Sequence, residues 1–196
     1  MPDIMIMGGL VRQSRFEPSA VLHSNIGSLQ KQFRPGRTSS TAFLPDEDPV
    51  VQCIKQRAAD FQGYADVEQV DEIQVTHYEG GQQFRNHYDW KSFGERGTTD
   101  RETTFFAYLD ANCTNCGTRF PYLSYDWTAA DQSWCQWVDC GEPALTIKPV
   151  PGSALFWRNL YNNGTGDRRS LHEGLPLTGY DFKTGLNIWT MIDVSP

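Results

Sequence analysis

The stretch EIQVTHYEGGQQFRNHYDW, residues 72–90, contains two short segments, 72–78 and 86–90, that are rich in β-branched or aromatic residues. A glycine-containing turn separates them, as expected between neighbouring β-strands. Segments of the same kind follow, with Gly, Pro and Asn between them, at 103–110, 145–150, 154–160, 170–177 and 185–194. This pattern predicts a β-sandwich or β-barrel of the jelly-roll type, whose interior can enclose a small-molecule site.

The segment before this stretch has helical rather than strand periodicity. In PDEDPVVQCIKQRAADFQ, residues 45–62, Asp48 is suited to cap a helix and Pro49 to its first turn. Apolar residues then recur at helical spacing: Val50, Ile54, Ala58 and Phe61. A tight turn is expected at PVPGS, 149–153. We therefore expect a mainly β fold with flanking helices around a double-stranded β-helix (jelly-roll, cupin-like) core.

Length and charge limit the kinds of partner. The 196 residues suit one domain, 1–196, with no internal repeat. A net charge of −7 argues against nucleic acid or an anionic membrane as the main partner, because both require clustered Lys and Arg. No membrane segment is expected, since no apolar run approaches eighteen residues. The chain is expected to be soluble, in the cytoplasm or, if an upstream signal has been removed, in the secretory lumen.

The five cysteines leave several alternatives open. Cys113 and Cys116 lie in CTNC, and Cys135 and Cys140 lie in CQWVDC, with Cys53 left over. These pairs are compatible with disulfides, with reduced thiols or with a zinc site.

His87 and Asp89 are the first candidates for metal binding. In a strand, residues i and i+2 project to the same face, so the two side chains would form a two-ligand edge. A second histidine from a distant strand would complete the facial triad that binds non-haem Fe(II), and His172, in SLHEGLP, is the best placed of the remaining histidines. The plain alternative is two polar residues on the wet face of a strand, because His and Asp often fall two apart by chance.

Lys183 lies eleven residues beyond His172, on the next expected strand. Inside the barrel its ammonium group would pair with a carboxylate of a chelating co-substrate. A lysine taken alone is more often a solvated surface residue. The order and spacing of all four residues therefore carry the hypothesis.

With these residues in place, the chain resembles the prolyl 4-hydroxylase-like branch of the Fe(II)/2-oxoglutarate-dependent dioxygenases. The resemblance covers about residues 37–192. It is carried, in family order, by RTSSTAFL, EIQVTHYEGGQQFRNHYDW, RETTFFAYLD, CGTRFP, WCQWVDC, LTIKPVPGSALFW, SLHEGLP and KTGLNIW.

The resemblance implies a role for each matching residue. His87, Asp89 and His172 correspond to the iron ligands, and Lys183 to the residue that pairs with the distal carboxylate of 2-oxoglutarate. Three further side chains are expected beside that co-substrate: Tyr78, Tyr108 and Thr118. Three are expected to contact the substrate: Arg101, Trp189 and Phe84, the last at a position where relatives often carry tyrosine.

The resemblance further implies the reaction and its cofactors. We expect Fe(II), 2-oxoglutarate and O2 to be used, with ascorbate in support, to hydroxylate prolyl residues of a peptide or protein. Asp89 argues for hydroxylation, because halogenating relatives lack this carboxylate. Two alternatives are a tailoring oxygenase acting on a free amino acid or secondary metabolite, and a non-catalytic binding module on the same barrel.

Overall fold

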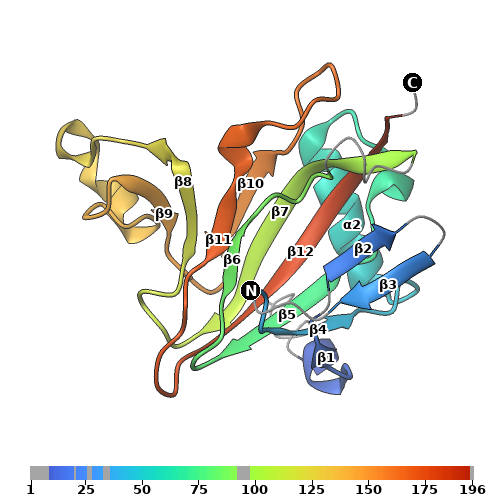
Figure 1. Cartoon of the computed structure of the whole chain (residues 1–196), viewed down its shortest axis with the longest axis horizontal. Coiled ribbons are helices and arrows are strands. Elements are labelled where there is room, and N and C mark those ends of the chain that lie inside the picture. Colours follow the sequence, from blue (N-terminus) through green and yellow to red (C-terminus); the bar gives the residue numbers. More distant parts are fainter. Residues whose placement is uncertain (1–8, 20, 26–27, 33–35, 92–97, 195–196) are drawn as a thin grey trace.

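The computed structural model describes residues 9–19, 21–25, 28–32, 36–91 and 98–194. Within these residues the chain is built mainly from two antiparallel β-sheets that pack against each other as a jelly-roll core (Figure 1). Side chains from both sheets meet between them: the Tyr108 hydroxyl lies 2.7 Å from Thr118 Oγ1, and the Phe120 and Trp157 rings pack edge to face. The predicted mainly β, jelly-roll fold is confirmed.

The two sheets differ in size. The larger sheet has the strand order β1 (Glu17–Pro18), β4 (Ser40–Phe43), β5 (Gln74–Glu79), β12 (Phe182–Asp193), β7 (Thr99–Ala111) and β10 (Ala154–Arg158). The smaller has the order β6 (Phe84–His87), β11 (His172–Gly174), β8 (Thr118–Ser124) and β9 (Ala144–Ile147). A separate hairpin pairs β2 (Val21–Asn25) with β3 (Ser28–Gln32). In the described part of the chain, the connections contain four 3-10 helices: η1 (Val67–Gln69), η2 (Trp127–Ala129), η3 (Gln132–Gln136) and η4 (Arg168–Ser170).

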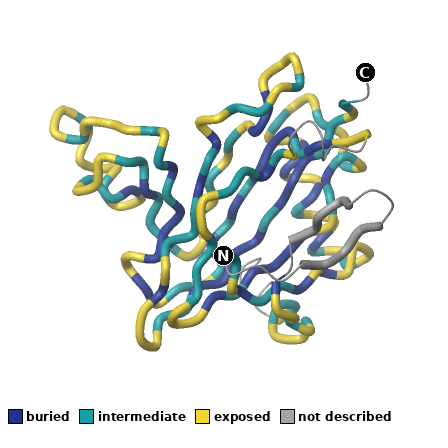
Figure 2. The backbone as a smooth tube through the Cα atoms, in the orientation of Figure 1, coloured by how far each residue is buried: buried dark blue, intermediate teal, exposed yellow. Residues whose placement is uncertain are grey.

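The central strands of the larger sheet are buried on both faces (Figure 2). On β12, Leu186 and Ile188 belong to an apolar cluster with helix α2 (Pro49–Gln62). Lys183 and Trp189, at odd positions of the same strand, are buried on the other face, because successive side chains alternate across a sheet. The second face therefore carries polar and aromatic groups toward the interior between the sheets.

Helix α2 covers the outer face of the larger sheet. Asp48 caps it, since its carboxylate accepts a hydrogen bond of 2.8 Å from the Val50 N–H, and Pro49 occupies the first turn, as predicted. The predicted apolar face is only partly right, because Val51 is fully buried whereas Phe61 is 68% exposed. Phe61 instead packs edge to face on Phe105 and Phe156 at the end of the helix.

Several expected strands have different limits in the structure. The expected strand at 86–90 ends at His87, and the one at 170–177 is reduced to β11. Strand β8 was not expected as a strand. The turn predicted at 149–153 is present, with the Ser153 N–H donating to the Val150 carbonyl at 3.1 Å, and it leads the chain from the smaller sheet to the larger.

Four of the five cysteines form disulfides, which settles the alternatives left open by the sequence. Cys113 pairs with Cys116 and Cys135 with Cys140, while Cys53 is free and exposed on α2. Both pairs close short loops beside β8, one before the strand and one after it (Figure 1). Among the described residues, no helix combines the length and apolar character needed to cross a bilayer.

Candidate metal and co-substrate site

The smaller sheet brings two distant histidines together. His87 ends β6 and His172 begins β11, and the two are direct partners in the antiparallel pairing of these strands. Asp89 follows in the loop after β6, so it joins the pair by a turn of the chain rather than by the strand alternation expected from the sequence. One ligand atom from each of the three residues lies within 4.8 Å of the other two.

The other two histidines, His77 and His23, are not part of this cluster as far as the structure describes them. His77, on β5, has its Nδ1 2.8 Å from Thr184 Oγ1 and takes no part in the cluster. His23 lies in β2, and its side chain falls outside the described residues.

Backbone carbonyl groups orient both imidazoles of the cluster. His87 Nδ1 lies 2.8 Å from the carbonyl oxygen of Arg85, and His172 Nδ1 lies 2.9 Å from that of Ser170. A carbonyl oxygen only accepts, so each Nδ1 carries the proton and each Nε2 keeps its lone pair. His87 Nε2 is 3.8 Å from Asp89 Oδ1, and His172 Nε2 is 3.9 Å from Asp89 Oδ2. The three ligand atoms thus converge on one point.

The carboxylate of Asp89 is buried and held from one side. Its Oδ2 accepts hydrogen bonds from Thr104 Oγ1 at 2.8 Å and from Trp189 Nε1 at 3.2 Å. The Thr104 hydroxyl in turn accepts a hydrogen bond of 2.8 Å from Asn159 Nδ2, and both Thr104 and Asn159 are fully buried. Sequence reasoning did not identify Thr104 or Asn159, because threonine and asparagine are common residue types and only the strand pairing places these two here.

The electrostatic surroundings of the cluster favour a neutral imidazole at His87 and an ionised carboxylate at Asp89. Burial, reinforced by the nearby His172, lowers the pKa of His87 to about 3. Burial alone would raise the pKa of Asp89, but His172, His87 and Arg101 outweigh it and hold that pKa at about 2. A neutral imidazole and an ionised carboxylate are the forms that bind metal ions.

This donor set fits a divalent transition metal. Two imidazole nitrogens and one carboxylate on one side of an ion form the facial triad of non-haem Fe(II) oxygenases, which leaves coordination positions open. The ligand atoms of the two His–Asp pairs lie 3.8 and 3.9 Å apart, somewhat more than the roughly 3 Å between neighbouring ligands at 90° around an ion with bonds of about 2 Å, so a small inward movement of the side chains would accompany metal binding.

Lys183 is buried beside this cluster in the interior. It is 1% exposed, it pairs with Tyr78 across β5 and β12, and its Nζ lies 5.0 Å from the centre of the Tyr78 ring. Its ammonium group donates to the carbonyls of Cys116 and Gly117, and burial lowers its pKa to about 7. Lys183 is therefore not the solvated surface residue that a lysine taken alone would more often be.

Two hydroxyl groups lie next to the Lys183 carbonyl partners. Thr118 directly follows Gly117, and its Oγ1 lies 2.7 Å from the Tyr108 hydroxyl. Both residues are at least 95% buried, and burial raises the pKa of Tyr108 well above its ordinary value. A neutral phenol and a hydroxyl therefore lie close to the carbonyl groups that accept hydrogen bonds from the buried Lys183.

The three residues expected to contact substrate surround the cluster. The Phe84 ring stacks on that of His87, with 3.5 Å between centroids. The Arg101 guanidinium lies 3.6 Å from the centre of the Trp189 ring. Trp189 is only 4% exposed and also donates to Asp89, so it connects Arg101 to the carboxylate.

Comparison with known protein families gives a consistent result. A family model described as the 2OG-Fe(II) oxygenase superfamily matches residues 73–191. The chain is 31% identical over 144 residues to probable prolyl 4-hydroxylase 3 of Arabidopsis thaliana, with 72% of this chain and 50% of that protein covered. It is 31% identical over 148 residues to prolyl 4-hydroxylase subunit alpha-1 of Rattus norvegicus, with 72% and 24% covered. It thus spans about half the length of the plant relative and a quarter of the rat protein.

Among solved structures, the fold is similar to that of a viral collagen prolyl hydroxylase from Paramecium Bursaria Chlorella virus-1, determined as a 2OG complex. The TM-score is 0.60 at 21% identity, and 95% of this chain and 84% of the viral chain are covered. At this level of identity the likeness concerns the fold alone.

Proposed function

Because the chain belongs to the 2OG-Fe(II) oxygenase superfamily, we propose that it is an Fe(II)- and 2-oxoglutarate-dependent hydroxylase whose substrate is a prolyl residue of a peptide or protein. The single observation that carries this proposal is the convergence of His87, Asp89 and His172 on one point in a chain that buries Lys183 nearby. When bound, Fe(II) together with 2-oxoglutarate and O2 would supply the oxidising chemistry, with succinate and CO2 as co-products.

In this proposal His87, Asp89 and His172 hold the metal, and the chain prepares each of them in advance. The Arg85 and Ser170 carbonyls keep the protons of the imidazoles on the nitrogens that point away. Thr104 and Trp189 occupy Oδ2 of Asp89, which leaves Oδ1 as the less encumbered ligand atom. Metal binding would require only a small rearrangement of these three side chains, because hydrogen bonds already orient them.

Lys183, Tyr108 and Thr118 would bind the distal carboxylate of 2-oxoglutarate, with Tyr78 alongside. A buried ammonium group whose present partners are two carbonyls gains a charged partner when a carboxylate enters, which favours its protonated form. Gly174 lies beside this ammonium group, since a Cβ at that position would be in ordinary van der Waals contact with Lys183 Nζ at 3.6 Å. The buried setting would also exclude water from the co-substrate.

A prolyl substrate is supported by the relatives, which carry the name prolyl 4-hydroxylase, and by the aromatic and cationic groups around the cluster. Phe84 stacked on His87 and Arg101 above Trp189 would hold an apolar ring and a peptide group close to the metal. No observation favours a free amino acid or a secondary metabolite over a peptide.

The test measures two products in parallel. Purified protein with Fe(II), 2-oxoglutarate and ascorbate is given proline-rich peptides, free proline or a panel of small metabolites. Succinate release and hydroxylated substrate are both quantified by mass spectrometry. We expect coupled hydroxylation of peptides alone. Hydroxylation of small metabolites alone would contradict a prolyl substrate and would favour a tailoring oxygenase instead.

Ligand variants test the metal assignment in the same assay. Asp89→Ala or His172→Ala is expected to abolish succinate formation, whereas His77→Gln, which changes a histidine outside the cluster, should retain it. Near-normal turnover in either ligand variant would contradict the assigned roles.

A further inference from the structure

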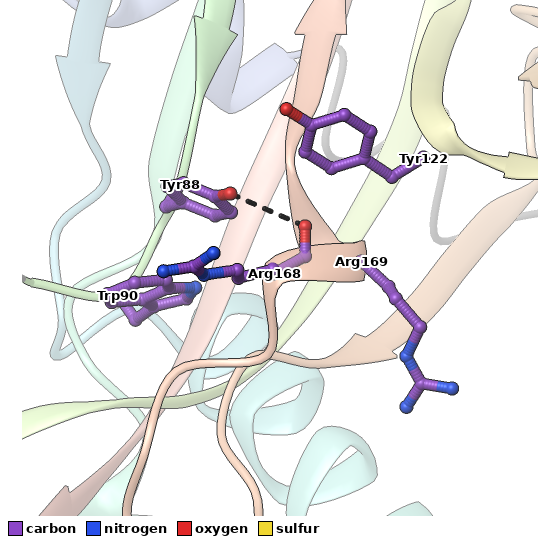
Figure 3. Close-up of a pocket in the computed structure, with 5 residues that line it drawn as sticks. All are labelled: Tyr88, Trp90, Tyr122, Arg168 and Arg169. Atoms are coloured by element: carbon purple, nitrogen blue, oxygen red, sulfur yellow. Dashed lines mark hydrogen bonds between the residues drawn. The ribbon is translucent and has the colours of Figure 1, made fainter.

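A pocket lies beside the candidate metal site, and none of the residues that line it has a role in the proposed function. We call it the arginine–aromatic pocket (Figure 3). It has a volume of about 590 Å³ and is lined by Tyr88, Trp90, Tyr122, Arg168 and Arg169. Its walls come from three segments: the chain that follows β6, strand β8, and η4.

The chain itself connects this pocket to the metal cluster. Tyr88 is the residue between His87 and Asp89, and Arg169 lies three residues before His172. Phe120 of β8 packs on His172, with 5.5 Å between ring centroids, and Tyr122 follows Phe120 by two residues, a step of about 7 Å along a strand. Tyr122 is 63% exposed, so the pocket begins where the interior around the metal cluster reaches solvent.

The aromatic wall of the pocket is held in place. The Tyr88 and Trp90 rings lie 4.5 Å apart, centroid to centroid, at 36°. The Tyr88 hydroxyl donates to the Arg168 carbonyl at 3.4 Å, and Trp90 Nε1 donates to the Asp167 carbonyl at 3.3 Å. Trp90 also packs closely on Gly166, where an added Cβ would come within 2.3 Å of the indole ring. These contacts fix a pair of ring faces rather than a mobile surface.

The two arginines differ in how their charge is used. Arg169 is neutralised by Asp167, with Nη2 2.7 Å from Oδ2 and Nε 3.1 Å from both carboxylate oxygens. The guanidinium of Arg168 forms no ion pair or hydrogen bond with any residue in the part of the chain that the structure describes, and its carbonyl is what Tyr88 contacts. Among the residues that the structure describes, the pocket therefore presents one cation without a charged partner beside two aromatic faces, in a chain of net charge −7.

We infer that the arginine–aromatic pocket is a second substrate subsite, which binds the segment of an extended, proline-containing peptide that flanks the hydroxylated residue and places a side-chain carboxylate on Arg168. This inference rests on the proposed function. Grooves lined by fixed aromatic rings recognise polyproline II segments, because these are already extended and lose little entropy on binding. A guanidinium without a partner adds selectivity for a carboxylate.

The spacing between the two sites sets which residue of the peptide is recognised. Tyr88 of the pocket lies between His87 and Asp89 in the chain, and a polyproline II peptide advances about 3.1 Å per residue. The carboxylate is therefore expected a few residues from the target proline, and the test covers positions two to four residues away. A free peptide C-terminus would offer the same chemistry, so the test uses peptides with blocked ends.

The experiment compares acidic and neutral flanks in matched peptides. Acetylated and amidated proline-rich peptides carry either Glu or Gln, two to four residues to one side or the other of a single target proline. The measured quantity is the ratio of kcat/KM for the Glu peptide to that for the Gln peptide, from peptide hydroxylation by mass spectrometry. For the unmodified enzyme we expect a ratio of about five to ten at one of these positions, as for a charge-assisted contact at a partly exposed site.

Three variants identify the residue responsible. Arg168→Gln should reduce the ratio to about one, whereas Arg12→Gln, an exposed arginine remote in sequence from the pocket, should leave the ratio as it is. Tyr122→Ala should raise KM for both peptides, because it removes an aromatic wall without changing charge. Thermal unfolding and peptide-independent 2-oxoglutarate turnover of each variant show that the fold and the metal site are intact.

The outcomes separate the subsite from the proposed function. Peptide hydroxylation with a ratio near one in the unmodified enzyme, or a ratio that survives Arg168→Gln, overturns the subsite and leaves prolyl hydroxylation standing. Turnover of 2-oxoglutarate without hydroxylation of any peptide overturns both. A ratio that disappears only in Arg168→Gln supports the inference.

Discussion

At the scale of single residues, Thr104 connects the metal cluster to the rest of the interior. Its hydroxyl donates to Asp89 and accepts from Asn159, so replacing it changes the environment of the carboxylate without removing a metal ligand. Outer-shell partners of this kind orient ligands and commonly alter metal affinity by 10- to 100-fold.

We predict that Thr104→Val weakens Fe(II) binding by about 10- to 100-fold, because Oδ2 of Asp89 loses one of its two donors and gains freedom to rotate. Fe(II) affinity measured anaerobically is the readout. Thr103→Val is the matched control, since Thr103 is equally buried but donates to Gln62 on the opposite side. Equal losses in both variants would show a general effect of packing.

The pKa of Lys183 makes co-substrate binding depend on pH. Burial lowers this pKa to about 7, below its value of about 10.4 in an unfolded chain. Between these two values the unfolded state binds more protons, so the stability penalty of burying Lys183 is fully present below pH 7 and is relieved as pH rises toward 10. Binding of 2-oxoglutarate has the opposite trend, because the carboxylate needs the protonated amine.

We therefore predict that the 2-oxoglutarate concentration for half-saturation rises roughly 25-fold between pH 6.5 and 8.5, the change expected when only the protonated form of a group with a pKa of about 7 binds. Lys183→Arg should remove this dependence, since a guanidinium stays charged throughout. A parallel rise in the Arg variant would assign the pH effect to another group.

These residues also show where sequence reasoning succeeds. His87, Asp89, His172 and Lys183 were identified because chemically distinctive types occur in a fixed order; the structure places the first three together and buries Lys183, whose role stays a prediction. Thr104 and Asn159 were missed because threonine and asparagine are common, and their importance arises only from strand register. Asp89 was assigned to the correct cluster for an incorrect local reason, as the strand ends before it.

At the scale of elements, the loop between β7 and β8 forms part of the Lys183 environment. The Cys113–Cys116 disulfide closes this loop, and the carbonyls of Cys116 and Gly117 accept from the buried ammonium group. The second disulfide, Cys135–Cys140, lies between β8 and β9 and has no such contact with Lys183.

The two disulfides should therefore differ in effect when each is removed. We predict that the double variant Cys113→Ser/Cys116→Ser raises the 2-oxoglutarate concentration for half-saturation by about fivefold, because the carbonyls that position Lys183 become less ordered. Cys135→Ser/Cys140→Ser should change it by less than about twofold. Both variants are compared below their own unfolding temperatures, and similar rises in the two would contradict a specific role for the first loop.

Helix α2 shows which element features a sequence can and cannot specify. The start of the helix was predicted correctly, because capping by Asp48 and the first-turn Pro49 act locally. Its buried face was only partly predicted, because the position of Phe61 depends on the Phe105 and Phe156 rings of two distant strands. Strand β8 was missed for a similar reason, since it gains its strand character from pairing with β11 and β9.

At the scale of the whole molecule, ligands that join the two sheets should stabilise the native state. The metal ligands lie in and next to the smaller sheet, while Lys183 belongs to the larger one. A ligand present at 100 times its dissociation constant adds about 2.7 kcal/mol to the free energy of unfolding. In a chain of this size each kcal/mol shifts Tm by about 2–4 °C.

We predict that Fe(II) and 2-oxoglutarate, each at about 100 times its dissociation constant under anaerobic conditions, each raise Tm by roughly 5–11 °C and together by roughly 11–22 °C. Asp89→Ala should lose the metal-dependent part, and Lys183→Ala should lose only the increment from 2-oxoglutarate. Differential scanning fluorimetry with each ligand alone and with both separates these contributions. An undiminished shift in Asp89→Ala would place the bound metal elsewhere.

The direct pairing of His87 with His172 across β6 and β11 has a consequence for biogenesis. A slip of one residue between two strands turns the affected side chains to the opposite face. A misaligned nascent chain would then point one imidazole outward and fail to retain iron. Iron binding would in this way depend on correct strand register, and a misregistered molecule would lack the oxygen chemistry proposed for the site.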